Sequence, residues 1–290
     1  AIVLAGNHDG QVFVPSKSLL SLGTASVFEK PSSEQFCVRF RSSADEPVAV
    51  TALPYPHERV VIRLNGAGDD VRGDYAASVS GFIRWLTAQM DPQDINVFGA
   101  HLMVGGAQLT DTERPASVSP FFALPAQSLP SQTMYNALGH VHRHQQMSAA
   151  PARTEYAGSI FRVNFSEEGT PKGFNLVEAD TRGNLAVRFC ELRSAVQLHN
   201  VDCTPENWQA QLEPYKGRGY TKARVHADNP TLNLQGDIRA ACPWVVKVEF
   251  VRQQAQTTDR PSIDALASTT LETVQSMYRA FNADADDEAV

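Results

Sequence analysis

The stretch Tyr-Asn-Ala-Leu-Gly-His-Val-His, residues 135–142, has the pattern of a short apolar strand that ends in two histidines. A second stretch of this kind, Ile-Asn-Val-Phe-Gly-Ala-His at residues 95–101, also ends in a histidine. The chain opens with apolar residues 1–5, and the polar loop Gly-Asn-His-Asp-Gly follows at residues 6–10. Buried strands that end in polar residues are typical of an α/β protein whose site lies at the carboxyl edge of its sheet.

A strand and a helix are predicted between these segments. Residues 47–53, Pro-Val-Ala-Val-Thr-Ala-Leu, are expected to form a further buried strand. Apolar residues then recur at i, i+3, i+4, i+7 and i+11, which is the spacing of one helix face: Val79, Phe82, Ile83, Leu86 and Met90. Asp91-Pro92 is expected to end that helix. The alternation of strand, helix and strand predicts an α/β fold.

The pattern changes from about residue 196 onward. Thr204-Pro205-Glu206 places a capping residue before a proline, which is typical of a helix start. Residues 222–226 and 244–251 are predicted strands. The second is expected to have one apolar face, formed by Trp244, Val246, Val248 and Phe250. We therefore predict a small α+β domain here.

Charge and cysteine content exclude several classes of protein. Of the 290 residues, 25 are Lys or Arg and 32 are Asp or Glu, so the formal net charge is −7. This balance argues against a protein that coats nucleic acid without specificity, but it allows one local basic groove. No apolar run approaches the roughly 18 residues that span a bilayer, so we expect no membrane segment. The cysteines lack CxxC spacing, which predicts reduced thiols in a cytoplasmic protein: Cys37, Cys190, Cys203 and Cys242.

Histidines are concentrated in one part of the chain. Four of the eight lie within 44 residues, where an even spread would put roughly one: His101, His140, His142 and His144. Residues i and i+2 of a strand share a face, so His140 and His142 can point toward one site. Imidazole is the commonest side-chain ligand of transition metals. With Asn7 and His8 in the first loop, this set predicts a metal site, whereas His144 is expected to be a solvated neighbour.

These motifs together resemble those of the calcineurin-like metallophosphoesterase superfamily. Residues 6–9 (GNHD), 100–101 (AH) and 139–142 (GHVH) are similar to its third, fourth and fifth blocks. Within the superfamily, the chain resembles the SbcD-type nuclease subunits of double-strand-break repair complexes. The similar segments are ALPY at 52–55, ALGHVHR at 137–143, YAGS at 156–159, FSE at 165–167 and KG at 172–173. The resemblance covers about residues 1–195.

The resemblance implies a metallophosphoesterase β-sandwich flanked by helices and a centre with two divalent metal ions, Mn²⁺ in this family. By resemblance, Asn7, His101 and His140 are ligands of one ion and His142 is a ligand of the other. His8 would be the catalytic histidine that assists the leaving oxygen of a scissile phosphate, and Asp9 would orient His8. Phosphodiester hydrolysis needs charge neutralisation and a water of lowered pKa, and two ions about 3.5–4 Å apart supply both.

The printed sequence departs from the family pattern at its start. The family's first two blocks, DxH and GDxxD, stand before GNHD and supply two aspartates and a histidine, including the carboxylate that bridges the metals. Neither block lies between Ala1 and the GNHD motif. We expect an ordered upstream segment to carry them, because a strand at residue 1 would otherwise lose its sheet neighbours. The alternative is an incomplete enzyme.

Three parts of the chain are predicted: a nuclease domain at 1–195, a capping domain at 196–255, and a C-terminal helix with an acidic tail at 256–290. In the second part, basic residues without intervening acids are expected to contact DNA phosphates: Lys216, Arg218, Lys222 and Arg224. The alternative is a solvated loop face. The amphipathic residues 263–281 are expected either to dock on an SbcC-like ATPase or to pack on the chain's own core.

The resulting functional hypothesis is a manganese-dependent DNA exonuclease and endonuclease that acts on DNA ends and hairpins in repair and recombination. The resemblance implies an SbcC-like ATPase partner and a homodimer. Two alternatives remain open at this point. One is a stand-alone phosphoesterase that acts on nucleotides or phosphoproteins, and the other is a noncatalytic DNA-repair scaffold.

Overall fold

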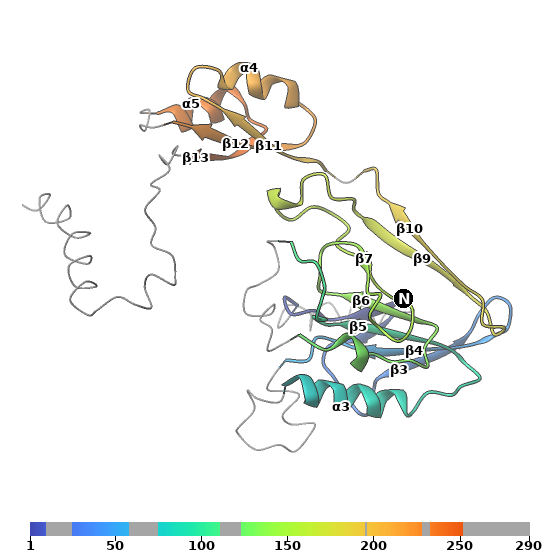
Figure 1. The fold of residues 1–290 in the computed structure, drawn as a ribbon. Coiled ribbons are helices and arrows are strands. Elements are labelled where there is room, and N and C mark those ends of the chain that lie inside the picture. The colour runs from blue at the N-terminus through green and yellow to red at the C-terminus, as the bar shows by residue number, and fades with distance from the viewer. Residues whose placement is uncertain (10–24, 58–74, 111–122, 195, 228–232, 252–290) are drawn as a thin grey trace, which may run out of the picture.

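The computed structural model describes residues 1–9, 25–57, 75–110, 123–194, 196–227 and 233–251. Its largest element is a six-stranded sheet (Figure 1) with the order β3-β4-β5-β6-β8-β7. These strands are β3 (Cys37–Arg41), β4 (Pro47–Leu53), β5 (Ile95–His101), β6 (Tyr135–Gly139), β7 (Gln145–Gln146) and β8 (Thr154–Tyr156). The four central strands are parallel and the two edge strands are antiparallel to their neighbours. The predicted α/β class is confirmed, and the carboxyl ends of β4, β5 and β6 meet at one edge.

One face of this sheet is covered by helix α3 (Tyr75–Thr87). Val79, Ile83 and Leu86 are buried there, as their helical spacing predicts, and they share a core cluster with Phe98 of β5. Phe82 is half-buried, and Met90 lies beyond the last helical residue. The apolar stripe therefore fixes which side of the helix faces the sheet.

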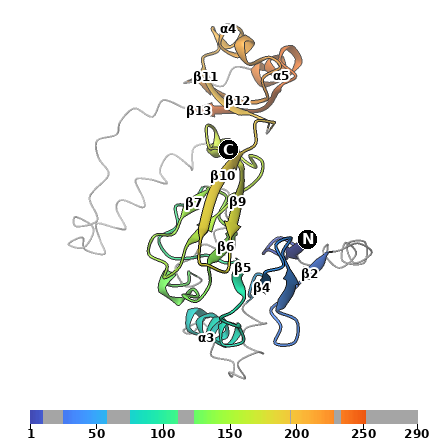
Figure 2. The ribbon, with the colours of Figure 1, turned by 90° about the vertical axis from the view of Figure 1, so that its right-hand side faces the viewer.

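The opposite face is partly covered by a hairpin of β9 (Gly173–Ala179) and β10 (Leu185–Glu191). Asn175 of this hairpin donates hydrogen bonds to the Tyr135 hydroxyl (2.9 Å) and to Glu155 Oε2 (2.9 Å) on the sheet. In Figure 2, β9 and β10 extend from this region toward the part of the fold that holds β11–β13.

The first strand brings the chain's opening loop to the sheet edge. β1 (Ile2–Leu4) pairs in parallel with β2 (Ser26–Phe28) and lies against β5. This pairing of β1 was not predicted from the sequence. The Tyr55 amide donates to the Ala5 carbonyl (2.9 Å), which joins the end of β1 to the segment after β4. Residues 6–9 consequently start at the carboxyl edge of the large sheet.

A separate three-stranded sheet follows, made of β11 (Leu198–Cys203), β12 (Tyr220–His226) and β13 (Val245–Val251). Helices α4 (Trp208–Leu212) and α5 (Leu234–Ala241) connect its consecutive strands, and all three strands are parallel. The prediction of an α+β arrangement is wrong, because a crossover helix between neighbouring strands makes them parallel and gives an α/β unit. This unit has its own core, which contains Trp208, Leu212 and Ile238.

Two details of this unit differ from the sequence prediction. Helix α4 begins at Trp208 rather than at Thr204-Pro205, although Thr204 makes the bonds of a capping residue: its Oγ1 accepts from the Glu206 amide (3.3 Å) and its carbonyl accepts from the Trp208 amide (3.1 Å). In β13, Val245 is buried, whereas Val246 and Phe250 are exposed. A register shift in the pairing of β12 with β13 interrupts the simple alternation from which one apolar face was predicted.

The remaining regular elements are short 3₁₀ turns: η2 (Ala126–Ser128), η3 (Phe165–Glu167) and η4 (Glu213–Tyr215). All four cysteines are free, as predicted. Within the described ranges, no helix has the length and apolar character needed to cross a membrane. The predicted helix at 263–281 and the acidic tail lie outside the described residues.

Tyr156 ties the ends of β5 and β8 together, and its removal gives a direct stability test. Its fully buried hydroxyl donates to the Leu102 carbonyl (2.7 Å) and accepts from the Val104 amide (3.0 Å), and burial raises its pKa. Tyr156→Phe leaves both buried groups without this partner, so we expect the free energy of unfolding to fall by about 1–3 kcal/mol. Urea denaturation measures the change. Tyr220→Phe, at an exposed ring, is the control and should change stability by less than about 0.5 kcal/mol.

Candidate metal centre

Three polar side chains from separate segments meet at the carboxyl edge of the large sheet. Asn7 lies in the turn after β1, His101 is the last residue of β5, and His140 directly follows β6. Asn7 Oδ1 is 3.1 Å from His101 Nε2, and His101 Nε2 is 3.3 Å from His140 Nδ1. The parallel pairing of β5 with β6, in which His101 is opposite Gly139, places the two histidines side by side.

Two glycines make room for the His101 ring. A Cβ on Gly6 would lie 2.6 Å from His101 Cε1, and a Cβ on Gly139 would lie 3.1 Å from His101 Nδ1. Real Cβ atoms do not approach a ring as closely as the first of these distances. The glycines that precede Asn7 and His140 therefore allow backbone and imidazole to pack in direct contact.

His140 has an unusual backbone conformation, with φ of 101°. A non-glycine residue in this region is strained by roughly 1–3 kcal/mol, and such strain is concentrated at functional sites. The side chain of His140 is also buried, at 7% exposure. The chain thus turns sharply at the end of β6 and directs this imidazole toward His101 rather than along the strand.

Tyr55 covers the two histidines from the segment after β4. Its ring stacks on His140 with 5.8 Å between centroids and meets His101 edge-on at 6.0 Å. Burial raises the pKa of its hydroxyl. Tyr55 belongs to the ALPY segment, to which no role was assigned from the sequence. Its aromatic ring limits the orientations that both imidazoles can adopt.

The electrostatic surroundings keep His101 neutral. Burial and, to a smaller extent, repulsion by the nearby imidazoles of His140, His8 and His142 together lower its pKa to about 3. Desolvation and like charges both disfavour the protonated, cationic form of His101, so the ring is uncharged at neutral pH. A neutral imidazole has a lone pair, which a metal ion requires of a histidine ligand.

The separations of these atoms fit neighbouring ligands of one divalent ion. Two ligand atoms about 2.1 Å from an ion and at right angles to each other lie about 3.0 Å apart. The observed 3.1 and 3.3 Å agree with this value. The set supplies one amide oxygen and two imidazole nitrogens. In the described part of the chain, no group of three His, Cys, Asp or Glu side chains could hold a metal, so the fit depends on Asn7.

His142 lies two residues beyond His140 but contacts a different set of residues. Its Nδ1 is 3.2 Å from Oε1 of Glu167, a fully buried carboxylate on η3. Glu167 also forms a salt bridge with the buried Lys172 (3.2 Å). Both residues belong to the FSE and KG segments, but no role was assigned to either of them from the sequence. Acidic and basic residues in a loop are usually solvated, so their burial could not be predicted from the sequence.

The turn that carries His8 is closed by Asp9. The Gly6 amide donates to Asp9 Oδ2 (2.7 Å), and the Asp9 amide donates to the Gly6 carbonyl (3.3 Å). His8 is exposed at the tip of this turn, close enough to His101 to lower its pKa. The predicted role of Asp9 in orienting His8 stays a prediction. In the structure, Asp9 closes the turn that carries Asn7.

The other histidines lie in different environments. His144 stacks on Phe189 with 4.0 Å between centroids, and its Nε2 is 3.5 Å from Glu155. His199 is 3.3 Å from the Arg218 carbonyl, and His226 is 2.7 Å from Asp202 Oδ1. His144 is thus turned toward β8 and β10 rather than toward His101.

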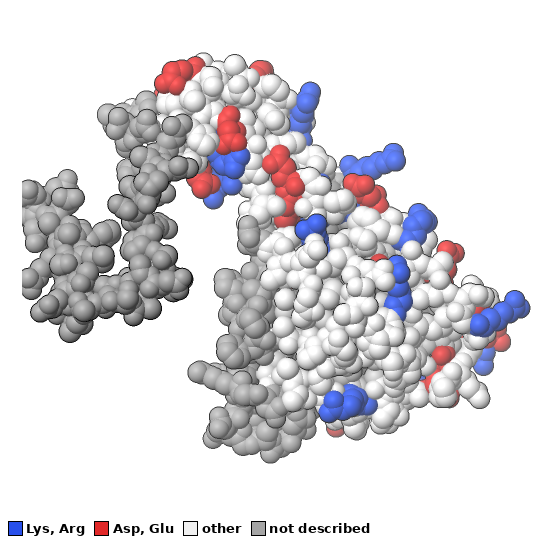
Figure 3. Space-filling model, in the orientation of Figure 1, with Lys and Arg blue, Asp and Glu red and all other residues white. Residues whose placement is uncertain are grey.

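The four basic residues predicted to contact DNA lie on and before β12. Lys216 is 3.7 Å from Glu213, Lys222 is 3.6 Å from Glu249, and Arg224 forms a salt bridge with Asp202. Within the described ranges, the Arg218 side chain has no carboxylate within ion-pair distance. On the face seen in Figure 3, Lys and Arg are interspersed with Asp and Glu rather than gathered in one basic patch. DNA contact by these four residues stays a prediction.

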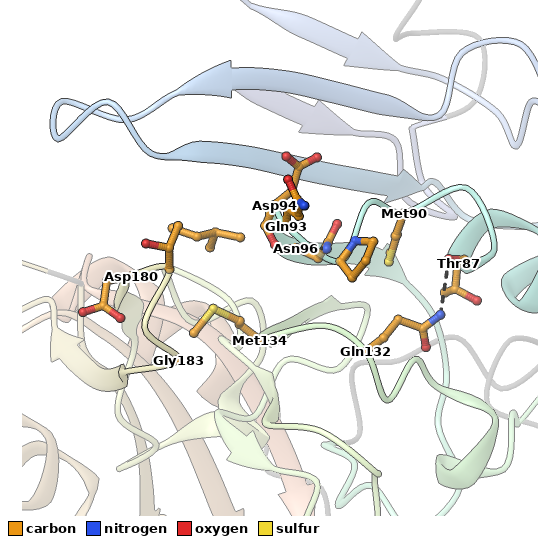
Figure 4. A pocket seen from close by; sticks show the side chains of 12 residues that line it. Thr87, Met90, Gln93, Asp94, Asn96, Gln132, Met134, Asp180 and Gly183 are labelled. Atoms are coloured by element: carbon orange, nitrogen blue, oxygen red, sulfur yellow. Dashed lines mark hydrogen bonds between the residues drawn. The ribbon is translucent and has the colours of Figure 1, made fainter.

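The pocket in Figure 4 is distinct from the candidate metal site at the carboxyl edge of the large sheet. It has a volume of about 440 Å³ and lies at the amino end of β5, where Ile95 and Asn96 line it together with Met134 and Asp180. Gln132 closes one side by donating to the Thr87 carbonyl (3.2 Å). No histidine or cysteine lines it. The chemistry of the side chains, rather than the depth of a pocket, therefore identifies the candidate site.

Comparison with known proteins finds similarity to a nuclease subunit. The chain is 32% identical over 185 residues to the SbcD subunit of the nuclease SbcCD from Bacillus subtilis (strain 168), and the match covers 61% of this chain and 46% of that protein. The chain thus spans about half the length of the curated relative. This likeness supports a relationship to SbcD-type nuclease subunits. No family model matches the chain.

One solved structure is similar to this chain only at a low level. A chain described as "OtsA apo structure" matches with a TM-score of 0.20 and 8% identity, covering 96% of this chain and 75% of that one. A TM-score of this size carries no argument about the fold. The α/β class follows from the strand order and pairing described above.

Proposed function

We propose that this chain is the nuclease part of an SbcD-like subunit, a phosphodiesterase that uses divalent metal ions to cleave DNA. One observation carries the proposal: three atoms that can bind a metal ion meet at the carboxyl edge of parallel strands. Asn7 Oδ1 lies 3.1 Å from His101 Nε2, which lies 3.3 Å from His140 Nδ1. The likeness to the Bacillus subtilis nuclease subunit supports the same assignment. The β-sandwich form of the fold and the division at residues 195 and 255 are parts of this proposal.

In the proposed mechanism, Asn7, His101 and His140 hold one divalent ion, and His142 contributes to a second. When bound, such ions supply charge neutralisation at the phosphate and lower the pKa of an attacking water. Asn7 is uncharged, so it leaves more of the ion's positive charge for the phosphate. His8, exposed at the rim of the site, donates a hydrogen bond or proton to the leaving oxygen. Mn²⁺ is the ion that we propose.

The DNA path and the partners are proposed on separate grounds. Four basic side chains would contact the phosphate backbone: Lys216, Arg218, Lys222 and Arg224. Lys216, Lys222 and Arg224 form ion pairs with carboxylates in this structure, and DNA phosphates would replace these carboxylates. An SbcC-like ATPase and a second copy of the chain are the proposed protein partners. An acidic subunit gains much of its hold on DNA from such partners.

A cleavage assay tests the proposed function. We expect the purified protein to release fragments from linear and hairpin DNA in Mn²⁺ and to lose this activity in EDTA, because charge neutralisation and water activation both come from the ions. Cleavage that is unchanged in EDTA contradicts the metal mechanism. Hydrolysis of free nucleotides without any cleavage of DNA identifies a stand-alone phosphoesterase instead. Binding of DNA without cleavage in any divalent metal identifies a scaffold.

A further inference from the structure

We propose that Glu167 is a positioning residue that fixes which nitrogen of His142 faces the metal edge. Its carboxylate holds the hydrogen of the imidazole on Nδ1 and so leaves the Nε2 lone pair available for a ligand. This inference rests on the proposed function, in which His142 helps to hold a metal ion. It concerns residues from three loops that come together only in the folded chain.

The contact between the two side chains determines the direction of the hydrogen bond. Glu167 Oε1 lies 3.2 Å from His142 Nδ1, and the Glu167 side chain has 0% exposure. An ionised carboxylate can only accept hydrogen bonds, so His142 must donate from Nδ1. A neutral imidazole with its hydrogen on Nδ1 has its lone pair on Nε2. The Thr110 hydroxyl donates to the same carboxylate oxygen at 3.3 Å.

The other oxygen of Glu167 is held by two donors. Lys172 Nζ lies 3.2 Å from Oε2 and the Val163 amide donates to Oε2 at 2.9 Å. The Lys172 side chain also has 0% exposure. Its ammonium keeps the buried carboxylate ionised by direct attraction, and the carboxylate in turn compensates the buried ammonium. Rotation of the Glu167 carboxylate away from His142 would break these contacts.

The same network holds the backbone of His142. Lys172 Nζ donates to the His142 carbonyl (3.1 Å) and to Ser159 Oγ (2.8 Å), and the Ser159 amide donates to the His142 carbonyl (3.1 Å). Gly158 has φ of 79°, and a Cβ there would lie 2.8 Å from the His142 carbonyl oxygen. The backbone is therefore fixed on one side by residues 158–159 and Lys172. These contacts do not determine the rotation or the tautomer of the His142 ring, and we assign both to its contact with Glu167.

A glutamine at position 167 separates positioning from simple packing, because it has nearly the same shape but only one oxygen. The Val163 amide and Lys172 both donate to the Oε2 position, so the glutamine must place its oxygen there. Its NH₂ group then faces His142 Nδ1, which must accept, and the imidazole hydrogen moves to Nε2. Glu167→Gln is therefore expected to reverse the tautomer of His142 and to block the nitrogen that a metal would use.

The experiment is two-bond ¹H–¹⁵N NMR of histidine-labelled protein without metal, at mildly alkaline pH. His142→Gln identifies the signals of His142. We expect hydrogen on Nδ1 in the unmodified protein and on Nε2 in Glu167→Gln. Glu155→Gln is the matched control, because Glu155 is also buried and contacts His144 instead; it should leave the His142 signals unchanged. Glu167→Gln alone leaves the buried Lys172 ammonium without its counter-charge and can unfold the protein. Glu167→Gln/Lys172→Met removes both charges together, so we expect this double variant to stay folded and to show the same reversal.

A second measurement connects the tautomer to metal binding. Residues that orient a metal-binding histidine typically change metal affinity by about 10–100-fold, so we expect Glu167→Gln to weaken Mn²⁺ binding by this amount in an EPR titration. Hydrogen on Nε2 in the unmodified protein, alone or together with Nδ1, overturns the inference. So does an unchanged His142 tautomer in both variants that carry glutamine at position 167. Absence of Mn²⁺ binding by the unmodified protein instead overturns the proposed function, because the tautomer measurement contains no metal.

Discussion

His101→Ala is expected to raise the Mn²⁺ dissociation constant by at least about 100-fold. His101 Nε2 is the central atom of the candidate site, 3.1 Å from Asn7 Oδ1 and 3.3 Å from His140 Nδ1, so its loss removes the one donor adjacent to both others. Substitution of groups that merely orient a ligand costs about 10–100-fold in affinity, and loss of a direct ligand should cost at least the upper value. EPR titration of free Mn²⁺ measures the change.

The same substitution should lower metal-dependent cleavage by about 10³-fold. Lewis-acid stabilisation of a transferring phosphate is worth several kcal/mol, and each 1.36 kcal/mol corresponds to roughly a tenfold change in rate. His144→Ala is the matched control, because His144 lies in the same histidine-rich segment but stacks on Phe189. An equal loss of Mn²⁺ affinity in both variants, or no loss in His101→Ala, would contradict the assignment of the site.

Gly6→Ala is expected to weaken Mn²⁺ binding by about 10–100-fold through displacement of the His101 ring. The added Cβ would lie 2.6 Å from His101 Cε1 and 2.9 Å from Nε2, so either the imidazole or the loop that carries Asn7 must move. The ring cannot move freely, because Gly139 and Tyr55 pack against it. Isothermal titration with Mn²⁺ measures the loss.

Gly99→Ala is the matched control for this prediction. Gly99 lies on β5, two residues before His101, and an added Cβ there would make only ordinary contacts, 3.8 Å from Leu4 Cδ2 at the nearest. We expect near-unchanged metal binding in this variant. If Gly6→Ala binds Mn²⁺ as tightly as the unmodified protein, the close packing of Gly6 against His101 does not define the site.

Much of the central sheet could be predicted from the sequence because its pattern is local. The strand predicted at 47–53 is β4, and the apolar runs before His101 and His140 are β5 and β6. Buried parallel strands form continuous apolar runs, and their carboxyl ends lie at one edge of the sheet. The convergence of His101 and His140 follows from that rule once the strands are placed, whereas the position of Asn7 depends on the pairing of β1 with β2.

The surroundings of the site could not be predicted in the same way, because they depend on contacts between distant residues. Glu167 lies on the short turn η3 and Lys172 lies in the segment before β9, and only the folded chain shows that they are buried against each other and that Glu167 contacts His142. The parallel order of β11, β12 and β13 likewise depends on the crossover helices rather than on any one strand. The register shift between β12 and β13 arises from how the two strands pair, and the alternation of residues within one strand does not determine that pairing.

Anomalous X-ray diffraction from crystals of the protein soaked in Mn²⁺ tests the central claim most directly. We expect a manganese peak within bonding distance, about 2.0–2.3 Å, of Asn7 Oδ1, His101 Nε2 and His140 Nδ1 at the carboxyl edge of β5 and β6. A crystal in which manganese binds only elsewhere, for example at the acidic pocket near Asp94 and Asp180, would contradict it. So would the absence of any peak at a saturating concentration of the ion.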